Sequence, residues 1–237
     1  MKNKNKTLDN PVWNALNGLH AGFAVGNDVL KRYHPHILPF VGVNEKTKLP
    51  FNDITGILGN DEALLFLGEL PEIPVSMKVI SRLPCLQMVC SGPLPEVNRE
   101  EYEIVLLKSE NFVEIYEFVN MVQPGYFRKS TPLLGDYYGI RESGQLIAIT
   151  GQRFKVEGYT EVSAVCTHPE HTGKGLAKYL STFVCNKIFE GGSTPFQHVS
   201  AVNSRAIRLY EFLSFRTRRS IDCWRIGTGA QNGSQVN

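Results

Sequence analysis

A strand, a glycine turn and a helix follow one another between Glu161 and Glu190, and this order constrains the fold more than any other feature of the chain. The apolar residues 162–167 are typical of a buried strand, and the helix that follows carries an apolar stripe at helical spacing. Gly173 and Gly175 stand in the turn between them and have no Cβ. Because the first amides of a helix have no partner within it, the turn predicts a phosphate site.

Spacing within this turn separates the kinds of phosphate site. A nucleoside triphosphate loop needs Ser or Thr where this chain has Gly175, and a further glycine upstream that is absent from the sequence. A dinucleotide fingerprint needs a third glycine where Lys178 stands, and an acidic residue closing the next predicted strand, residues 195–202, which has none. A nucleoside triphosphate site is therefore excluded. An NAD-binding oxidoreductase is kept only as a distant third alternative for the function.

The turn resembles the acyl-CoA signature of the GNAT acetyltransferase superfamily, which reads Gln or Arg, two residues, Gly, any residue, and Gly or Ala. The matching segment is Thr172-Gly173-Lys174-Gly175-Leu176-Ala177. Thr172 departs from the pattern, which removes a long polar side chain but none of the backbone donors.

A second segment, residues 203–215, resembles the other GNAT signature: Asn, two residues, Ala, then Leu-Tyr and Gly-Phe. Asn203 and Tyr210 match it, and Ser214 replaces its glycine. Taken without the family, Asn203 is a good helix N-cap and the segment is an amphipathic helix. Two signatures in the family's order on one strand-helix scaffold identify the chain as resembling a GNAT N-acetyltransferase.

The remaining pattern gives an α+β protein. Strands are predicted at residues 102–107, 162–167, 195–202 and 216–226, a hairpin at 137–150, helices at 110–122, 176–190 and 204–213, and a short second helical segment at 126–129. This is the GNAT order, so the resemblance implies a mixed central sheet with splayed parallel strands flanked by helices.

The predicted domains are a smaller N-terminal α+β unit at residues 1–98, the GNAT domain at 99–228 and a flexible tail at 229–237. The proline-rich, charged residues 91–100 serve as the linker. In the N-terminal unit we expect one or two short helices within residues 13–33, strands at 37–43, 63–67 and 86–90, and a short helix at 52–58. This unit either lines the acceptor site, mediates a homodimer or is a degenerate second copy of the fold, and the sequence leaves the three open.

The resemblance also implies a mechanism. Backbone groups of Ala164, Val165 and Cys166 would bind the pantetheine arm of acetyl-CoA, and amides of Thr172, Gly173, Lys174, Gly175, Leu176 and Ala177 its pyrophosphate. Asn203 would touch the pantetheine or the acceptor, which is an unidentified primary amine. Glu161 is the candidate base, with a solvated strand-end carboxylate as the plain alternative, and Tyr210 is the candidate acid for the leaving thiolate.

Composition excludes several other classes. A net charge of +2 gives no reason to expect nucleic acid as a partner. The polar start and the lack of any 18-residue apolar stretch argue against a signal sequence and a membrane partner, so we expect a cytoplasmic protein. The five cysteines have no CxxC spacing and are read as small buried hydrophobes, without a metal site. The main competing function is a protein of the same fold that binds acyl-CoA as a sensor or assembly factor without turning it over.

Overall fold

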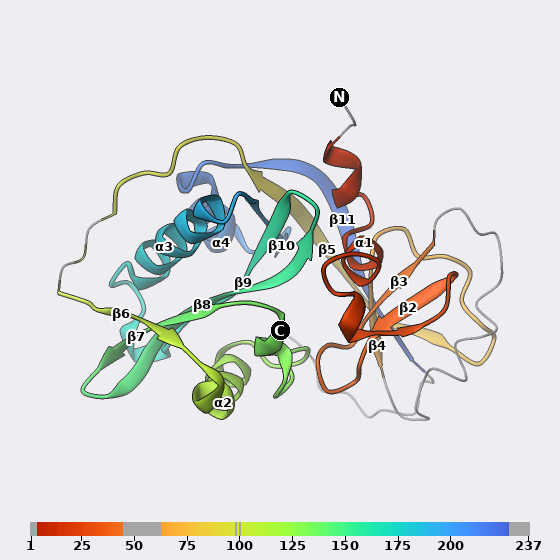
Figure 1. Cartoon of the computed structure of the whole chain (residues 1–237), viewed down its shortest axis with the longest axis horizontal. Coiled ribbons are helices and arrows are strands. Elements are labelled where there is room, and N and C mark those ends of the chain that lie inside the picture. Colours follow the sequence, from red (N-terminus) through yellow and green to blue (C-terminus); the bar gives the residue numbers. More distant parts are fainter. Residues whose placement is uncertain (1–3, 45–62, 98, 100, 228–237) are drawn as a thin grey trace.

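The computed structural model describes residues 4–44, 63–97, 99 and 101–227, and eleven strands within them form a single mixed sheet (Figure 1). The strands are β1 (Ala24–Gly26), β2 (Leu30–Tyr33), β3 (Phe40–Val43), β4 (Leu64–Leu67), β5 (Lys78–Cys90), β6 (Ile104–Leu107), β7 (Tyr137–Glu142), β8 (Gln145–Val156), β9 (Tyr159–Thr167), β10 (Thr194–Ser200) and β11 (Phe215–Gly227). Across the sheet their order is β1-β2-β3-β4-β11-β5-β10-β9-β8-β7-β6.

Helices cover both faces of the part of the sheet built from β6 to β10 (Figure 1). The α-helices are α1 (Pro11–Leu16), α2 (Phe112–Val122), α3 (Leu176–Glu190) and α4 (Ser204–Phe212). Short 3-10 turns are η1 (Lys4–Leu8), η2 (Ala21–Phe23), η4 (Ser109–Asn111), η5 (Thr131–Leu134) and η6 (Pro169–His171). In Figure 1, α3 and α4 lie on one face and α2 on the other. The α+β prediction is therefore confirmed.

The strands, the hairpin and the three longer helices expected in the second half of the chain are confirmed, with β8 and β9 longer than predicted. The helical segment expected at residues 126–129 is wrong, because those residues are not helical and the 3-10 turn η5 follows them. In the first half, the helical spacing of residues 29–33 was misleading, because this segment is strand β2. The Asn27 side chain accepts hydrogen bonds from the amides of Val29 and Leu30 and closes a tight turn, after which β2 pairs with β1 and β3. Pairing with neighbouring strands overrides helical spacing here. The helix expected at residues 52–58 and the tail at 229–237 lie outside the described residues.

The sheet crosses the boundary predicted at residue 98. β5, from the N-terminal half (residues 4–97), lies between β10 and β11 of the C-terminal half (residues 99–227) and is antiparallel to both. Its register places Cys85 opposite both Ser200 and Ile221. The division expected from the linker composition therefore does not divide the sheet, and neither half has a complete sheet without the other.

A shared core also joins the halves. Leu8, Val12 and Leu16 from the start of the chain are buried in one cluster with Phe154 and Phe196 of β8 and β10. The aromatic rings of Tyr33 and Phe154 stack with centroids 6.0 Å apart, and Phe40 meets Phe154 edge to face. The N-terminal half thus covers the face of β8, β9 and β10 on which the side chains described next are found.

Candidate functional site

The two central parallel strands separate after a short contact. β10 pairs with β9 only where Thr194, Pro195 and Phe196 face Tyr159, Thr160 and Glu161. Beyond Glu161, β9 continues along β8 while β10 continues along β5. The edge of β9 that faces β10 therefore has no strand partner from Val162 onward among the described residues, and its backbone groups are available to an extended ligand.

A β-bulge in β9 lies at this separation. Thr150 of β8 stands alone opposite Ala164 and Val165, because the register shifts between the pairs Gly151–Ser163 and Ile149–Cys166. Ala164 has a positive φ of 51°, a left-handed conformation that is costly for a residue with a Cβ. A bulge bends its own strand and redirects its groups, so this strained residue lies where β9 turns away from β10.

The glycine turn (residues 172–177) follows β9 and η6 and leads into α3. Gly173 and Gly175 have φ values of 82° and 77°. The first helical amide with a recorded acceptor is that of Tyr179, which donates to the Gly175 carbonyl at 3.1 Å. The amides of the glycine turn after Thr172 have no acceptor among the described residues. They form a set of free donors at the positive end of a fifteen-residue helix, an arrangement suited to an anion.

The side chain of Thr172 is turned back into this loop. Its hydroxyl donates to the Pro169 carbonyl at 3.1 Å, and its amide bonds the same carbonyl at 3.4 Å. Lys174 lies 3.1 Å from His171, and both approach the carboxylate of Glu142 at 3.8 and 3.7 Å. Neither Thr172 nor Lys174 therefore extends freely beyond the turn.

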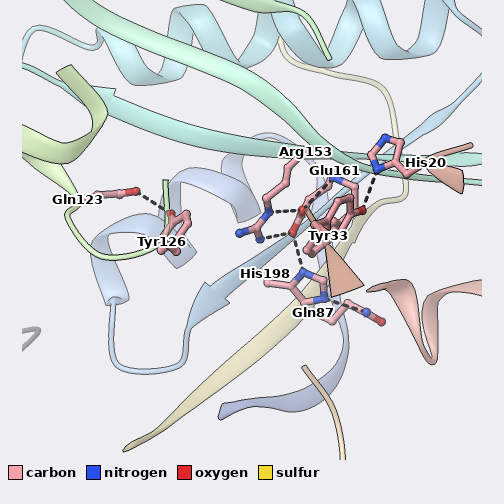
Figure 2. Close-up of polar contacts among 9 residues, drawn as sticks. His20, Tyr33, Gln87, Gln123, Tyr126, Arg153, Glu161 and His198 are labelled. Carbon is pink, nitrogen blue, oxygen red and sulfur yellow. Dashed lines mark hydrogen bonds and ion pairs between the residues drawn. The ribbon is translucent and has the colours of Figure 1, made fainter. Parts of the chain in front are cut away.

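The carboxylate of Glu161 lies at the base of the separated strands and is fully buried (Figure 2). Arg153 donates to it from Nε at 2.7 Å and from Nη2 at 2.8 Å, and His198 of β10 contacts it through Nδ1 at 2.7 Å. The amide of Phe154 donates to it at 3.3 Å. We call Arg153, Glu161 and His198 the buried ion cluster. The alternative interpretation of Glu161 as a solvated carboxylate at a strand end is therefore wrong.

A bulge in β8 makes this arrangement possible. Arg153 and Phe154 both stand opposite Glu161, since the register shifts between the pairs Gln152–Val162 and Lys155–Thr160. The extra residue brings a side chain and a backbone amide onto the same carboxylate. The Arg153 guanidinium also lies over the rings of Phe154, Phe40 and Tyr126 at 4.5, 5.0 and 5.5 Å, so it is enclosed by aromatic faces.

The surroundings fix the protonation of the buried ion cluster. Burial alone would raise the pKa of Glu161, but the Arg153 charge and the hydrogen bonds from Arg153 and His198 lower it to about 2. Burial lowers the pKa of His198 against the opposing effect of Glu161. At neutral pH, Glu161 is a carboxylate saturated by donors and His198 is a neutral imidazole.

The N-terminal half orients His198. Gln87 of β5 is fully buried, and its Nε2 lies 3.0 Å from Nε2 of His198 and donates to the Leu8 carbonyl at 2.9 Å. Arg218 donates to the Gln87 Oε1 at 2.8 Å, which assigns the amide orientation. Gln87 therefore donates to His198, and the imidazole proton is on Nδ1, facing Glu161. Figure 2 shows this chain from Gln87 to Glu161.

The second motif forms α4 as predicted. The Asn203 side chain caps the helix by accepting a hydrogen bond from the Ala206 amide at 3.0 Å, which leaves its own NH₂ group for another partner. Tyr210 is buried in a cluster with Phe215, and burial raises the pKa of its hydroxyl. Ser214, where the motif has glycine, adopts a positive φ of 61°. This conformation is the physical reason for a glycine at that position.

The cysteines fit the interpretation from sequence. All five are free thiols, and only Cys223 is not fully buried. Burial raises the pKa of the Cys166 thiol to about 12, so it is not a nucleophile at neutral pH.

The sequence interpretation missed Arg153, His198 and Gln87. The signal available for them was a charged or polar residue inside an otherwise apolar strand, as with Arg153 in β8 and His198 in β10. Such residues are seldom buried without a partner.

Comparison with known proteins agrees with this architecture. Residues 137–225 match the FR47-like protein family. A GNAT-family structure from Novosphingobium aromaticivorans DSM 12444 is 32% identical, covers 93% of this chain and 97% of its own, and superposes with a TM-score of 0.84. The chain therefore belongs to the GNAT acetyltransferase family, whose members are acyltransferases, and its curled mixed sheet with flanking helices is the GNAT fold.

More distant structures share the fold alone. A GCN5-related N-acetyltransferase from Kribbella flavida is 17% identical over 93% of this chain and 95% of its own, with a TM-score of 0.63. A GCN5-related N-acetyltransferase-like protein from Streptococcus suis 89/1591 is 14% identical over 86% and 82%, with a TM-score of 0.54. No curated protein sequence matches the chain. Within the described ranges, no helix has the length and apolar character needed to span a membrane.

Proposed function

We propose that the chain is an N-acetyltransferase that transfers an acetyl group from acetyl-CoA to a primary amine by direct attack in a ternary complex. The observation that carries this proposal is the separation of β9 from β10 beyond Glu161, directly ahead of a turn of free amides. An extended thioester arm fits along the unpaired edge of β9, and a diphosphate fits on the turn.

Donor binding is assigned mainly to backbone groups. The pyrophosphate of CoA would accept hydrogen bonds from amides of the glycine turn, and the pantetheine arm would pair with Ala164, Val165 and Cys166. The amide of Val165, within the bulge, would polarise the thioester carbonyl. The free NH₂ group of Asn203 would hold the pantetheine or the acceptor. None of these contacts requires a metal ion or a covalent enzyme intermediate.

The acceptor amine must lose a proton before or during attack, because an alkyl ammonium has a pKa near ~10. Glu161 accepts four hydrogen bonds and its pKa is about 2, so direct proton abstraction by this carboxylate is strongly uphill. We assign Glu161 an electrostatic role: its charge holds His198, and the acceptor would attack as the neutral amine that is in equilibrium with its ammonium form in solution. This keeps Glu161 in the catalytic set and narrows its role from base to stabilising charge.

Tyr210 would complete the reaction. As the amine nitrogen bonds to the carbonyl carbon, the carbon-sulfur bond breaks and CoA leaves as a thiolate. The Tyr210 hydroxyl is protonated at neutral pH and would donate its proton to the sulfur, although burial raises its pKa and makes it a weaker acid than an ordinary tyrosine. Solvent then reprotonates the tyrosinate.

Replacing Tyr210 with Phe tests this proposal, because the substitution removes only the hydroxyl. We expect kcat to fall by about 10²-fold to 10⁴-fold, with the affinity for CoA unchanged. CoA release over a panel of amines measures turnover, and calorimetry measures binding. Tyr138→Phe, on β7 against Phe183, is the matched control and should retain activity.

The outcomes separate the two candidate functions. If the wild-type protein binds acetyl-CoA but acetylates no amine, the alternative function, a non-catalytic acyl-CoA-binding protein, would be favoured. The departures from the family signatures at Thr172 and Ser214 are the observations that support this alternative. Full activity in the Tyr210 variant would remove Tyr210 from the mechanism.

A further inference from the structure

An arginine from outside both family signatures lies against the glycine turn. Nη2 of Arg99 is 3.0 Å from the point where a β-carbon of residue 175 would stand, and its Nε and Cζ are 3.7 Å from that point. The guanidinium therefore rests against Gly175 itself. The φ of 77° at residue 175 favours glycine, and a β-carbon there would press on the end of the Arg99 side chain.

A backbone hydrogen bond links Arg99 to Tyr102, which packs on α3. The amide of Tyr102 donates to the Arg99 carbonyl at 2.9 Å, which closes a turn. The Tyr102 ring packs on a cluster that contains Leu176 and Leu180, the buried residues of the first turns of α3. The segment after the linker is thereby fixed to the helix whose N-terminus carries the free amides.

The charge on Arg99 is weakly compensated. Its nearest recorded carboxylate is that of Glu101 at 3.6 Å, and both side chains are about half exposed, with 44% and 57% of their surface accessible. Lys174, the other cation of the turn, shares Glu142 with His171. Among the described residues, Arg99 is thus the cation beside the free amides whose donors are least engaged.

Resting on the proposed function, we infer that Arg99 is a pyrophosphate-binding residue for the CoA donor. It supplies the long polar side chain that the acyl-CoA signature has at its first position and that Thr172 lacks. The planar guanidinium offers paired donors to phosphate oxygens beside the free amides of the glycine turn. The ligand class is a diphosphate ester, and the residue comes from the segment that joins the two halves.

Arg99→Ala tests the assignment, with Arg99→Lys as the graded variant and Lys78→Ala, an exposed side chain of β5, as the charge-matched control. Calorimetry should measure the Kd of each protein for CoA and for dephospho-CoA, which lacks the 3'-phosphate. Turnover of acetyl-pantetheine, which has no phosphate, is the third measurement. Because Arg99 is half exposed, we expect a loss of about tenfold for both nucleotides, near the lower end for a charged hydrogen bond.

The expected pattern has three parts. Arg99→Ala weakens CoA and dephospho-CoA equally, Arg99→Lys weakens them less, and the KM for acetyl-pantetheine does not change. A loss seen with CoA alone would move Arg99 to the 3'-phosphate and overturn the assignment. An affinity equal to that of Lys78→Ala, or an equal loss with acetyl-pantetheine, would also overturn it. If wild-type protein binds no CoA at all, the proposed function itself fails, and this assignment fails with it.

Discussion

The two halves of the molecule contain the same succession of strand pairings. In the N-terminal half, β1, β2 and β3 are antiparallel and β3 is parallel to β4. In the C-terminal half, β7, β8 and β9 are antiparallel and β9 is parallel to β10. Both parallel contacts are brief, with two residue pairs between β3 and β4 and three between β9 and β10.

The halves differ in where their last strand goes. β5 ends the N-terminal half but pairs with β10, and β11 ends the C-terminal half but pairs with β4. The two exchanged strands then pair with each other along nearly their whole length. The C-terminal half carries the glycine turn and the motif residues. The N-terminal half contributes side chains that hold this site in place, such as Gln87, which contacts His198, and Phe40, which packs on Arg153.

Removing the N-terminal half should have the largest effect on stability and tests whether the two halves depend on each other. A fragment of residues 99–237 lacks β5, so β10 and β11 would lose their shared neighbour and buried side chains such as Met88 would be missing from the core. We expect no cooperative thermal transition by circular dichroism. Co-expression with residues 1–97 should restore it, because the exchanged strands can then pair. A fragment that melts cooperatively near the temperature of the whole chain would make the halves separable.

A second, smaller effect distinguishes the halves by pH. Burial, with a further contribution from Lys155, lowers the pKa of His20 in the N-terminal half from 6.5 to about 4. As the pH drops, the unfolded chain therefore binds a proton at His20 before the folded chain does. The free energy of unfolding should fall by about 3 kcal/mol between pH 6.5 and about pH 4. The folded structure lowers the pKa of Glu161 in the C-terminal half from 4.5 to about 2. The stability that Glu161 contributes is therefore lost at lower pH, as the pH falls from 4.5 to about 2.

Urea unfolding at pH 7, 5.5 and 4 measures this slope. His20→Gln should reduce it and leave the part contributed by His198, whose pKa burial also lowers, whereas His34→Gln, at an exposed histidine, should not reduce it. Equal slopes in the three proteins would show that the N-terminal half is not the source of this acid sensitivity.

The smallest effect concerns the contact between the linker and the second motif. The Ser214 hydroxyl donates to the Pro93 carbonyl at 2.6 Å, and the Ser91 amide donates to the Ser214 carbonyl at 3.0 Å. Ser214→Gly relieves the left-handed backbone but loses the side-chain bond, so we expect a change in unfolding free energy within about 1 kcal/mol.

Ser214→Ala keeps the strained backbone and also loses the bond, so it should be less stable than the glycine variant by about 1 kcal/mol. Urea denaturation of both variants measures the difference. An alanine variant as stable as the glycine variant would mean that the φ of 61° imposes no cost at this position.

The parts that could be predicted from sequence are local. The strand, glycine turn and helix around Gly173, and the N-cap at Asn203, depend on residues within a few positions of each other. The roles of Glu161, Tyr210, the glycine turn and Asn203 in catalysis or binding stay predictions that the experiments above address. The division of the chain into an N-terminal unit at residues 1–98, a GNAT domain at 99–228 and a tail at 229–237 also stays a prediction.

The parts that could not be predicted depend on distant pairings. Alternating apolar residues marked 86–90 as a strand, but no pattern there names Ser200 or Ile221 as neighbours of Cys85. The contact of Arg153 with Glu161 was hidden for a related reason. It needs an extra residue in β8, which breaks the alternation from which side-chain direction is judged.

The exchange of β5 and β11 also bears on how the chain is made. Leu64 of β4 finds its partner in Ile226, so the edge of the first half stays open on the ribosome until the last strand has been translated. Nascent chains would therefore expose an unsealed sheet edge for most of synthesis, a period in which chaperones can bind it and neighbouring nascent chains can pair with it.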